Sequence, residues 1–233
     1  MTGELARERE YERWLRGRGL NSAVIRWVMS GPGQWLINTP LMKLPENLML
    51  RADQRWLDVG CGRGTLLRLI DERVRFEVPP TGVDFTPAAL RLGQRDAQRK
   101  GQQIDLTAGT ATALPFADET FNLVTCGYML KHLTDEELDA FLAEVRRVLV
   151  GGGLALLWEF APTGSARLDA WNRRLLGAAV NEPTLRRTSL LRARAEAAGF
   201  EFVRDGTLRP FVFPPIPRAS ILVGRAPEGW TAD

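Results

Sequence analysis

Cysteine and histidine are scarce in this sequence, and their scarcity limits the chemistry that it can support. Only Cys61 and Cys126 carry thiols, and His132 is the single imidazole among 233 residues. These groups are too few to assemble a disulfide framework or a His/Cys zinc site. We therefore predict no metal centre, since any metal would have to rest on carboxylates alone.

Long apolar runs and an excess of one charge are also missing. No run approaches the roughly 20 apolar residues that cross a bilayer, and the first residues lack the apolar stretch of a secretory signal. We therefore expect a cytoplasmic protein without a transmembrane segment. The 31 basic residues exceed the 28 acidic residues by a net charge of +3. This balance does not indicate a nucleic-acid partner.

Arginines are nevertheless concentrated in one part of the chain. The stretch from Arg167 to Arg194 holds seven arginines, and its acidic residues are Asp169 and Glu182. We interpret the stretch as a solvated helical face. Binding of an anionic substrate or of a membrane surface is the alternative interpretation.

The residues that are present have the balance of a soluble globular protein. Hydrophobic residues make up 45% and charged residues 25% of the sequence, and the length suits one large α/β domain with small elaborations. Residues 1–50 show a helical pattern with Trp14, Trp27 and Trp35, which predicts an N-terminal helical cap. These tryptophans would anchor the cap on the domain, cover a substrate as a lid, or contact a membrane surface.

Residues 51–233 alternate between short apolar runs and helical stretches. We predict strands at 55–59, 81–85, 104–107, 121–125, 154–158, 200–203 and 221–223. We predict helices at 65–73, 87–100, 134–149 and 189–198, the second capped by Thr86 and the third begun by a capping box of Thr134 and Glu137. This order favours a doubly wound, mostly parallel seven-stranded sheet with the last two strands as an edge hairpin. The pause at 161–187 predicts a substrate-side insertion.

The most informative motif is a glycine-rich turn between the first predicted strand and its helix. Gly60, Gly62 and Gly64 let a ligand approach bare backbone at a helix N-terminus. Their spacing differs from that of a dinucleotide-binding loop, whose third glycine would stand at Thr65. Asp58, at the strand end, would repel a pyrophosphate and suit a cationic group, so we expect a ligand that carries an ammonium.

A second carboxylate follows at the end of the next predicted strand. Asp84 lies 24 positions after Gly60, close to the spacing at which an acidic residue binds the hydroxyls of a ribose in nucleotide-binding folds. Phe85 beside it offers a flat apolar surface to a purine. Together with the glycine loop, this pattern predicts a nucleoside site.

These residues carry a resemblance to a known family. The sequence resembles the class I S-adenosylmethionine-dependent methyltransferases, in the branch that acts on small metabolites and quinones, over roughly residues 50 to 160. The resemblance rests on LDVGCGRG, GVDFTPAAL, GTATALPFADETFNLVTC, and HLTDEEL followed by VRRVLVGGGLALLWE, in that order. It implies a Rossmann-like methyltransferase fold and S-adenosyl-L-methionine as the cofactor.

The resemblance also implies roles for individual positions. Asp58 and the backbone of Gly60, Cys61 and Gly62 would hold the methionine end of the cofactor. Asp84 would hold the ribose, Phe85 would lie against the adenine, Thr110 and Ala111 would meet the adenine edge, and the backbone near Cys126 would approach the sulfonium. Two positions depart from the family pattern, because Thr110 and Asn122 stand where aspartate is common. Thr110 or the backbone of Ala111 would then accept the hydrogen bond of the adenine amino group.

Two further residues are candidates for proton transfer. His132 follows the fourth predicted strand and could act as a general base, although local packing at a helix start explains it as well. Glu159 ends the fifth predicted strand and would either line the substrate pocket or simply end the strand. Tyr128 and Lys131 are interpreted as structural or solvated residues. Both cysteines are explained by the packing of small residues rather than by nucleophilic chemistry.

We therefore predict methyl transfer from S-adenosylmethionine to a small, apolar or amphipathic acceptor. The acceptor pocket would be formed by residues before Leu50 together with residues 160–187. The alternative is a catalytically silent protein of the same fold that binds the cofactor for regulation or scaffolding. A nicotinamide-dependent oxidoreductase is disfavoured by the glycine spacing and Asp58, and RNA methylation by the balanced charge.

Overall fold

The computed structural model describes residues 48–177, 184–206 and 217–227, together with Ala23, Trp27, Pro32 and Gly229, and omits the side chains of 173–177. Most of the predicted N-terminal cap, including Trp14 and Trp35, lies outside these residues. So does part of the insertion predicted at 161–187. The described Trp27 is helical and exposed.

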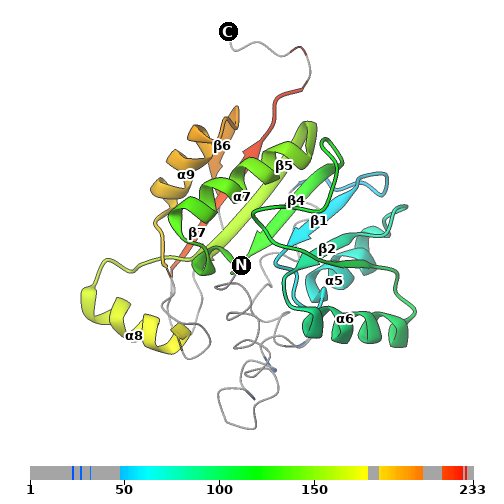
Figure 1. Ribbon diagram of the computed structural model, residues 1–233, viewed down its shortest axis with the longest axis horizontal. Helices are drawn as coiled ribbons and strands as arrows, with labels where there is room; N and C mark the ends of the chain where they lie inside the picture. Colours follow the sequence, from blue (N-terminus) through cyan, green and yellow to red (C-terminus); the bar gives the residue numbers. More distant parts are fainter. Residues whose placement is uncertain are drawn as a thin grey trace.

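Seven strands form one sheet in the described part of the chain (Figure 1). They are β1 (Trp56–Val59), β2 (Thr81–Asp84), β3 (Asp105–Ala108), β4 (Phe121–Gly127), β5 (Leu149–Phe160), β6 (Phe202–Asp205) and β7 (Arg218–Gly224). Their order is β3-β2-β1-β4-β5-β7-β6. Only β7 runs against its neighbours β5 and β6, which confirms the predicted mostly parallel sheet and the antiparallel pair at its edge.

Helices cover both faces of this sheet. They are α5 (Thr65–Val74), α6 (Pro87–Lys100), α7 (Asp135–Val148), α8 (Ala166–Gly177) and α9 (Thr188–Ala197), with the short 3₁₀ helix η2 (Leu130–His132) before α7. Buried residues of α7 and α9 share one core with β4, β5 and β7. Buried residues of α5 pack against Trp56 and Trp158 in a second core on the opposite face. The result is the three-layered doubly wound fold predicted from the sequence.

The strand order reverses its direction beside the glycine loop. After β1 the chain builds β2 and β3 on one side of the strand, and then returns to place β4 on its other side. Ligands of open α/β sheets bind at such a reversal, outside the carboxyl ends of the strands. The ends of β1, β2 and β4 therefore define where a ligand would bind.

Two local predictions need correction. Thr86 lies at the N-cap of α6, but its side chain makes no capping hydrogen bond. The arginine stretch is not simply a solvated face, because Arg186 is buried and donates to the carbonyl oxygens of Leu130 and Leu133. Arg186 also forms an ion pair with Asp135 of α7. This arginine therefore ties the chain before α9 to the start of α7.

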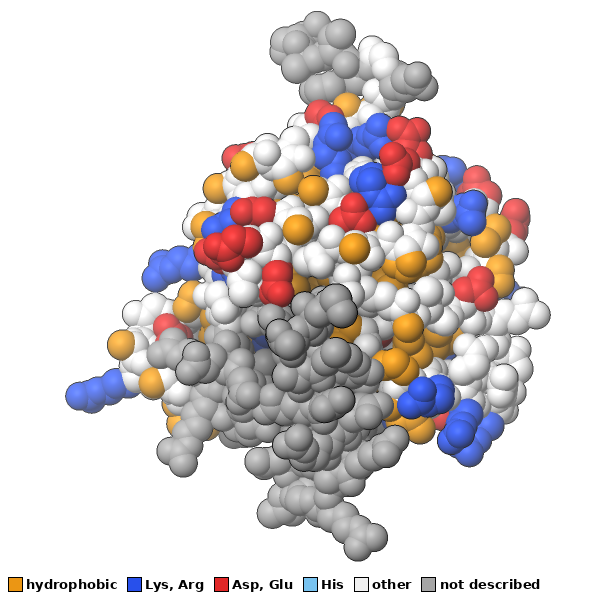
Figure 2. Space-filling model, in the orientation of Figure 1, with side chains coloured by type: hydrophobic (Ala, Val, Ile, Leu, Met, Phe, Trp, Pro, Cys, Tyr) orange, Lys and Arg blue, Asp and Glu red, His pale blue; other side chains and the backbone are white. Residues whose placement is uncertain are grey.

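Charges of both signs are interspersed over the described part of the face shown in Figure 2. Several of them form ion pairs between elements, such as Arg194 of α9 with Asp139 of α7. Exposed ion pairs of this kind contribute at most about 1 kcal/mol each. The stability of the fold therefore rests mainly on its two apolar cores.

The capping box of α7 provides a test of this local structure. The Thr134 hydroxyl accepts a hydrogen bond from the Glu137 amide, while the Glu137 carboxylate accepts one from the Thr134 amide. We expect Thr134→Ala to lower the free energy of unfolding by about 1 kcal/mol, because one orphan amide of the helix loses its partner. Thr134→Ser keeps the hydroxyl and should change the value little. Chemical denaturation measures both, and equal losses for the two variants would contradict the capping role.

Candidate active site

The turn from β1 to α5 takes a backbone conformation that its glycines permit. Gly60 and Gly62 have φ angles of 73° and 55°, in the left-handed region that favours glycine. A Cβ atom on Gly60 would lie 2.8 Å from the Cβ of Met129, so the loop after β4 closes directly over it. The amides of Gly60 and Cys61 both donate to the carbonyl oxygen of Val83 in β2. The glycine loop is thus fixed to the two strands that flank the crevice.

Asp84 connects this loop to the end of β2. One of its carboxylate oxygens accepts a hydrogen bond from the Gly62 amide and the other from the Thr86 amide, each at 2.8 Å. Burial nevertheless raises its pKa above the ordinary value. A carboxylate offers about four lone-pair positions, so two remain after these bonds. This geometry fits a pair of ribose hydroxyls. Phe85, the next residue, is 38% exposed.

Asp58 is a second buried carboxylate, at the end of β1. Its Oδ1 accepts a hydrogen bond of 2.6 Å from the Thr125 hydroxyl, which in turn accepts one of 2.9 Å from the Trp56 indole nitrogen. Burial raises the pKa of Asp58 to about 7, and the nearby charge of Asp84 adds to the increase. Within the described residues no basic side chain forms an ion pair with Asp58. A cationic ligand group would stabilise its ionised form.

The two thiols lie near these carboxylates but are not activated. Cys126 is fully buried in β4, between Val59 and Leu157 of the neighbouring strands. Burial raises the pKa values of Cys61 and Cys126 well above the ordinary thiol value, and the carboxylates reinforce the increase. Because a thiolate is the nucleophilic form, both residues are explained by packing, as the sequence indicated.

Thr110 and Ala111 begin the segment that follows β3. The Gly109 amide donates to the carbonyl oxygen of Asp84, and Thr110 forms an isolated bridge with Ala113. These contacts bring Thr110 and Ala111 to the end of the strand that adjoins Asp84. The predicted adenine-edge positions therefore lie next to the predicted ribose position.

Glu159 and His132, the candidate catalytic residues, lie near the end of β5 and in η2, which follows β4. The Glu159 carboxylate is 2% exposed and accepts hydrogen bonds from the amides of Lys131 and Phe160 at 2.9 and 2.8 Å. Its Oε1 also lies 3.6 Å from the Lys131 ammonium. Glu159 thus fixes η2 beside β5. His132 is half-buried in η2, and a catalytic role for either residue stays a prediction.

Tyr128 is a candidate that the sequence interpretation treated as structural. It follows the end of β4 with a φ of 56°, a strained conformation for a residue with a bulky side chain. Its ring lies 4.6 Å from that of Phe160 and meets Trp158 edge-on at 6.3 Å. Within the described residues, the Tyr128 hydroxyl and the Trp158 indole nitrogen are buried without a hydrogen-bond partner. Strained residues of this kind gather at functional sites.

The position of Tyr128 explains why it was missed. The ring of Trp158 occupies the space above Gly127, where a Cβ atom would lie 2.2 Å from the indole. This arrangement depends on the register between β4 and β5. The available sequence signal is a glycine followed by tyrosine at a strand end, which does not specify such contacts.

No group of three or more His, Cys, Asp or Glu residues among the described residues is arranged to hold a metal ion. No helix that the structure describes combines the length and the apolar character needed to cross a membrane.

Comparison with known proteins identifies the domain. Residues 57–153 match the family model described as a methyltransferase domain. The sheet order, the glycine loop and this match define a class I methyltransferase domain of the S-adenosylmethionine-dependent type. The resemblance read from the motifs is thereby confirmed.

Named relatives place the domain more closely. Over 117 residues the chain is 34% identical to the 2-phytyl-1,4-naphtoquinone methyltransferase of Thermosynechococcus vestitus, covering 50% of this chain and 51% of the relative. It is also 34% identical over 112 residues to the demethylmenaquinone methyltransferase of Thermus thermophilus, covering 48% and 50%. The chain thus spans about half the length of these curated relatives.

A solved structure supports the same fold. The YcgJ protein of Bacillus subtilis superposes with a TM-score of 0.58 at 29% identity, covering 70% of this chain and 68% of that one. The chain is therefore similar to methyltransferases of the quinone branch in sequence and to a solved relative in fold.

The pKa of Asp58 generates a test that needs no ligand. A carboxyl whose pKa is about 7 in the folded chain and about 3.9 when unfolded contributes stability that is fully present below about pH 3.9 and is lost as the pH rises from there to about 7. We expect Asp58→Asn, which stays neutral, to match the wild type at about pH 3.5, below the unfolded pKa, and to gain on it as the pH rises towards 7. Above pH 7 it should be more stable, by up to about 4 kcal/mol. Urea denaturation across this range measures the difference, and a gap that does not depend on pH would contradict the buried charge.

Proposed function

We propose that this protein transfers a methyl group from S-adenosylmethionine to a small molecule of the quinone type. The observation that carries the proposal is the pair of buried carboxylates, Asp58 and Asp84, on either side of a left-handed glycine loop. Each is at least nine-tenths buried and keeps lone pairs that face no basic side chain of the described chain. A ligand with both a cationic group and a ribose satisfies the pair.

The residues around the glycine loop have distinct roles in this proposal. Asp58 binds the methionine ammonium, Asp84 accepts the two ribose hydroxyls, and Phe85 lies against the adenine. When bound, the cofactor supplies an electrophilic methyl carbon, to which the acceptor forms its new bond while the bond to sulfur breaks and an acceptor proton leaves. The protein mainly has to align the acceptor with the carbon–sulfur axis and exclude water. Met129, packed over Gly60, contributes to this exclusion.

The acceptor is proposed to lie beside Tyr128. The Tyr128 and Phe160 rings form an aromatic wall with the Arg218 and Lys131 cations at its edges. The Tyr128 hydroxyl and the Trp158 indole nitrogen are buried donors without a geometric hydrogen-bond partner in the described chain. Such a surface suits an aromatic ring that carries oxygen. The names of the relatives, which act on naphthoquinone and demethylmenaquinone, support the same class. The pocket contributions of residues before Leu50 and of 160–187 remain proposals, as does contact with a membrane surface.

The silent alternative makes a different prediction. It requires that cofactor binding occur without turnover, and nothing in the site favours it, because no described side chain of the crevice forms an ion pair that would block Asp58 or Asp84. The relatives are named as enzymes, which also favours methyl transfer.

Calorimetry with defined ligands tests cofactor binding. We expect S-adenosylmethionine and S-adenosylhomocysteine to bind and NAD not to bind. Asp84→Asn should weaken S-adenosylhomocysteine binding by about 1 to 3 kcal/mol, because a charge-assisted acceptor becomes neutral. Asp105→Asn, at the opposite end of the neighbouring strand β3, should have no effect. Binding of NAD alone would overturn the proposal.

Turnover on a quinol tests the acceptor assignment. With labelled S-adenosylmethionine and a reduced 2-phytyl-1,4-naphthoquinone, we expect Tyr128→Phe to lower kcat/KM by about tenfold, the scale of one hydrogen bond to a polar partner. Cofactor affinity should stay unchanged, because the phenyl ring keeps its packing on Phe160. Val78→Ala serves as the control, because Val78 is exposed and precedes β2, at the end of the sheet away from Tyr128. Full activity of the Tyr128→Phe variant would remove Tyr128 from the acceptor site, and cofactor binding without turnover on quinols would favour the silent alternative.

A further inference from the structure

The connection between β3 and β4 lacks the helix that usually joins parallel strands. Both strands run in the same direction within the sheet, and such crossovers normally pass through an α-helix. Here residues 109–120 cross without one, and they contain one isolated bridge, between Thr110 and Ala113. Because backbone groups near a core need partners, this crossover segment, residues 109–120, must find its hydrogen bonds elsewhere.

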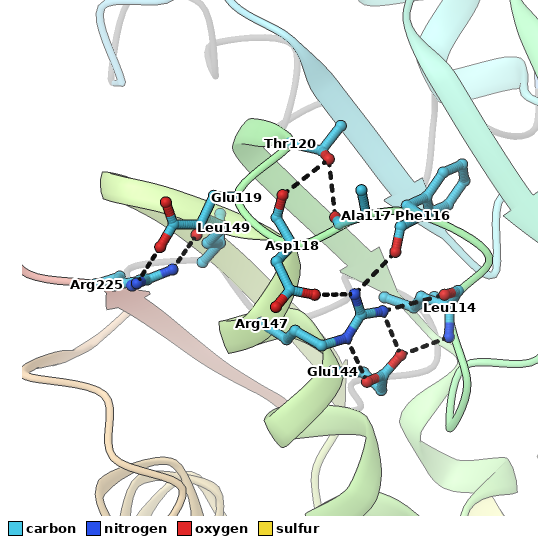
Figure 3. Close-up of polar contacts among 10 residues, drawn as sticks. All are labelled: Leu114, Phe116, Ala117, Asp118, Glu119, Thr120, Glu144, Arg147, Leu149 and Arg225. Atoms are coloured by element: carbon cyan, nitrogen blue, oxygen red, sulfur yellow. Dashed lines mark hydrogen bonds and ion pairs between the residues drawn. The ribbon is translucent and has the colours of Figure 1, made fainter.

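Arg147 of α7 supplies many of them (Figure 3). Its Nη1 donates to the carbonyl oxygen of Phe116 at 2.8 Å and to the Asp118 carboxylate at 2.7 Å. Its Nη2 donates to the carbonyl oxygen of Leu114 at 3.1 Å. The remaining donors, on Nε and Nη2, meet the two carboxylate oxygens of Glu144 at 2.7 and 2.8 Å. The five N–H donors of the guanidinium are therefore all used.

Glu144, three residues before Arg147 on α7, binds the same segment, and we call this Arg147–Glu144 pair the clamp. The oxygen that accepts from Arg147 Nη2 also accepts from the Leu114 amide at 2.7 Å. Both backbone polar groups of Leu114 are thus bound by the Arg147–Glu144 pair. The hydrogen bond with Arg147 lowers the pKa of Glu144, so the pair stays ionised at neutral pH. Leu114 itself is 5% exposed and belongs to the core beneath α7.

The clamp binds Leu114, which directly follows the turn from Thr110 to Ala113. The segment is fixed at its start by the bond from the Gly109 amide to Asp84. The Ala113 amide then donates to the carbonyl oxygen of Thr110, and Leu114 follows directly. Thr110 and Ala111 are therefore held between Asp84 on one side and the clamp on the other.

We propose that Arg147 and Glu144 are positioning residues that hold Thr110 and Ala111 in place to read the adenine of the cofactor. This inference rests on the proposed function. The adenine amino group is a donor, and its partner on the segment, the Thr110 hydroxyl or the Ala111 backbone, must lie at a fixed distance to accept from it. A planar guanidinium that binds three carbonyl or carboxylate groups of the segment at once fixes it more rigidly than an ammonium would.

Arg225 offers a matched control at the other end of the same segment. It donates to the carbonyl oxygen of Leu149 at 2.8 Å and pairs with Glu119, as Figure 3 also shows. Its side chain is 24% exposed, against 29% for Arg147. Arg225 therefore stabilises the return of the segment into β4, on the side of the clamp away from Thr110.

The experiment compares two ligands by calorimetry at a temperature well below unfolding. S-Adenosylhomocysteine carries the adenine amino group, and S-inosylhomocysteine carries a carbonyl oxygen there, which cannot donate. The wild type should prefer S-adenosylhomocysteine. Arg147→Lys should weaken its binding by about tenfold and S-inosylhomocysteine binding by much less, so that the preference shrinks. Arg225→Lys should leave the preference unchanged, although both variants lower the melting temperature.

Glu144→Gln keeps the inference testable if Arg147→Lys does not fold. It retains one acceptor for the Leu114 amide and should reduce the preference in the same direction, by about threefold. An unchanged preference in either folded variant, or an equal loss in Arg225→Lys, would overturn the positioning role and leave the proposed function intact. A wild type that binds neither ligand would instead overturn the proposed function.

Discussion

Two carboxylates buried without a basic partner in the described chain set the conditions for the rest of this site. Asp58 and Asp84 lie at the ends of adjacent strands, where burial raises the pKa of each. Their hydrogen bonds come from the Thr125 hydroxyl and from the amides of Gly62 and Thr86. These neutral donors orient the carboxylates and leave their charges uncompensated. The fold thus stores a destabilising interaction that a cationic nucleoside would relieve, which is a common relation between stability and binding.

The sequence was sufficient for the elements whose ends carry local signals. Pro87 and Gly101 define α6, which runs from Pro87 to Lys100 as predicted, and the capping box begins α7 where Thr134 indicated. β5 was predicted too short. It starts at Leu149, because Gly151 and Gly153 lie within an irregular stretch of pairing with β4 rather than ending it. The glycines between the predicted helix at 134–149 and the predicted strand at 154–158 are therefore part of the strand.

The position of a candidate site residue was predictable where it depends only on the end of the strand that carries the residue. Asp58, Asp84 and the glycine loop lie as the motifs indicated. The partners of Glu159 were not predictable, because its bond to the Lys131 amide joins positions 28 residues apart across the sheet. The strained backbone of Tyr128 and the contacts of Arg147 depend likewise on register and packing between distant elements. Such contacts leave no short motif in a single sequence.

The helix-free crossover has a consequence for how this domain can be altered. Because the segment after β3 takes its shape from side chains of α7, it is not an independent module. A loop taken from another protein and inserted at 109–120 would meet Glu144 and Arg147 arranged for a different backbone. Successful grafts would need to carry the matching turn of α7 with them, so exchange of the two as one unit is the natural route for redesigning base recognition in this scaffold.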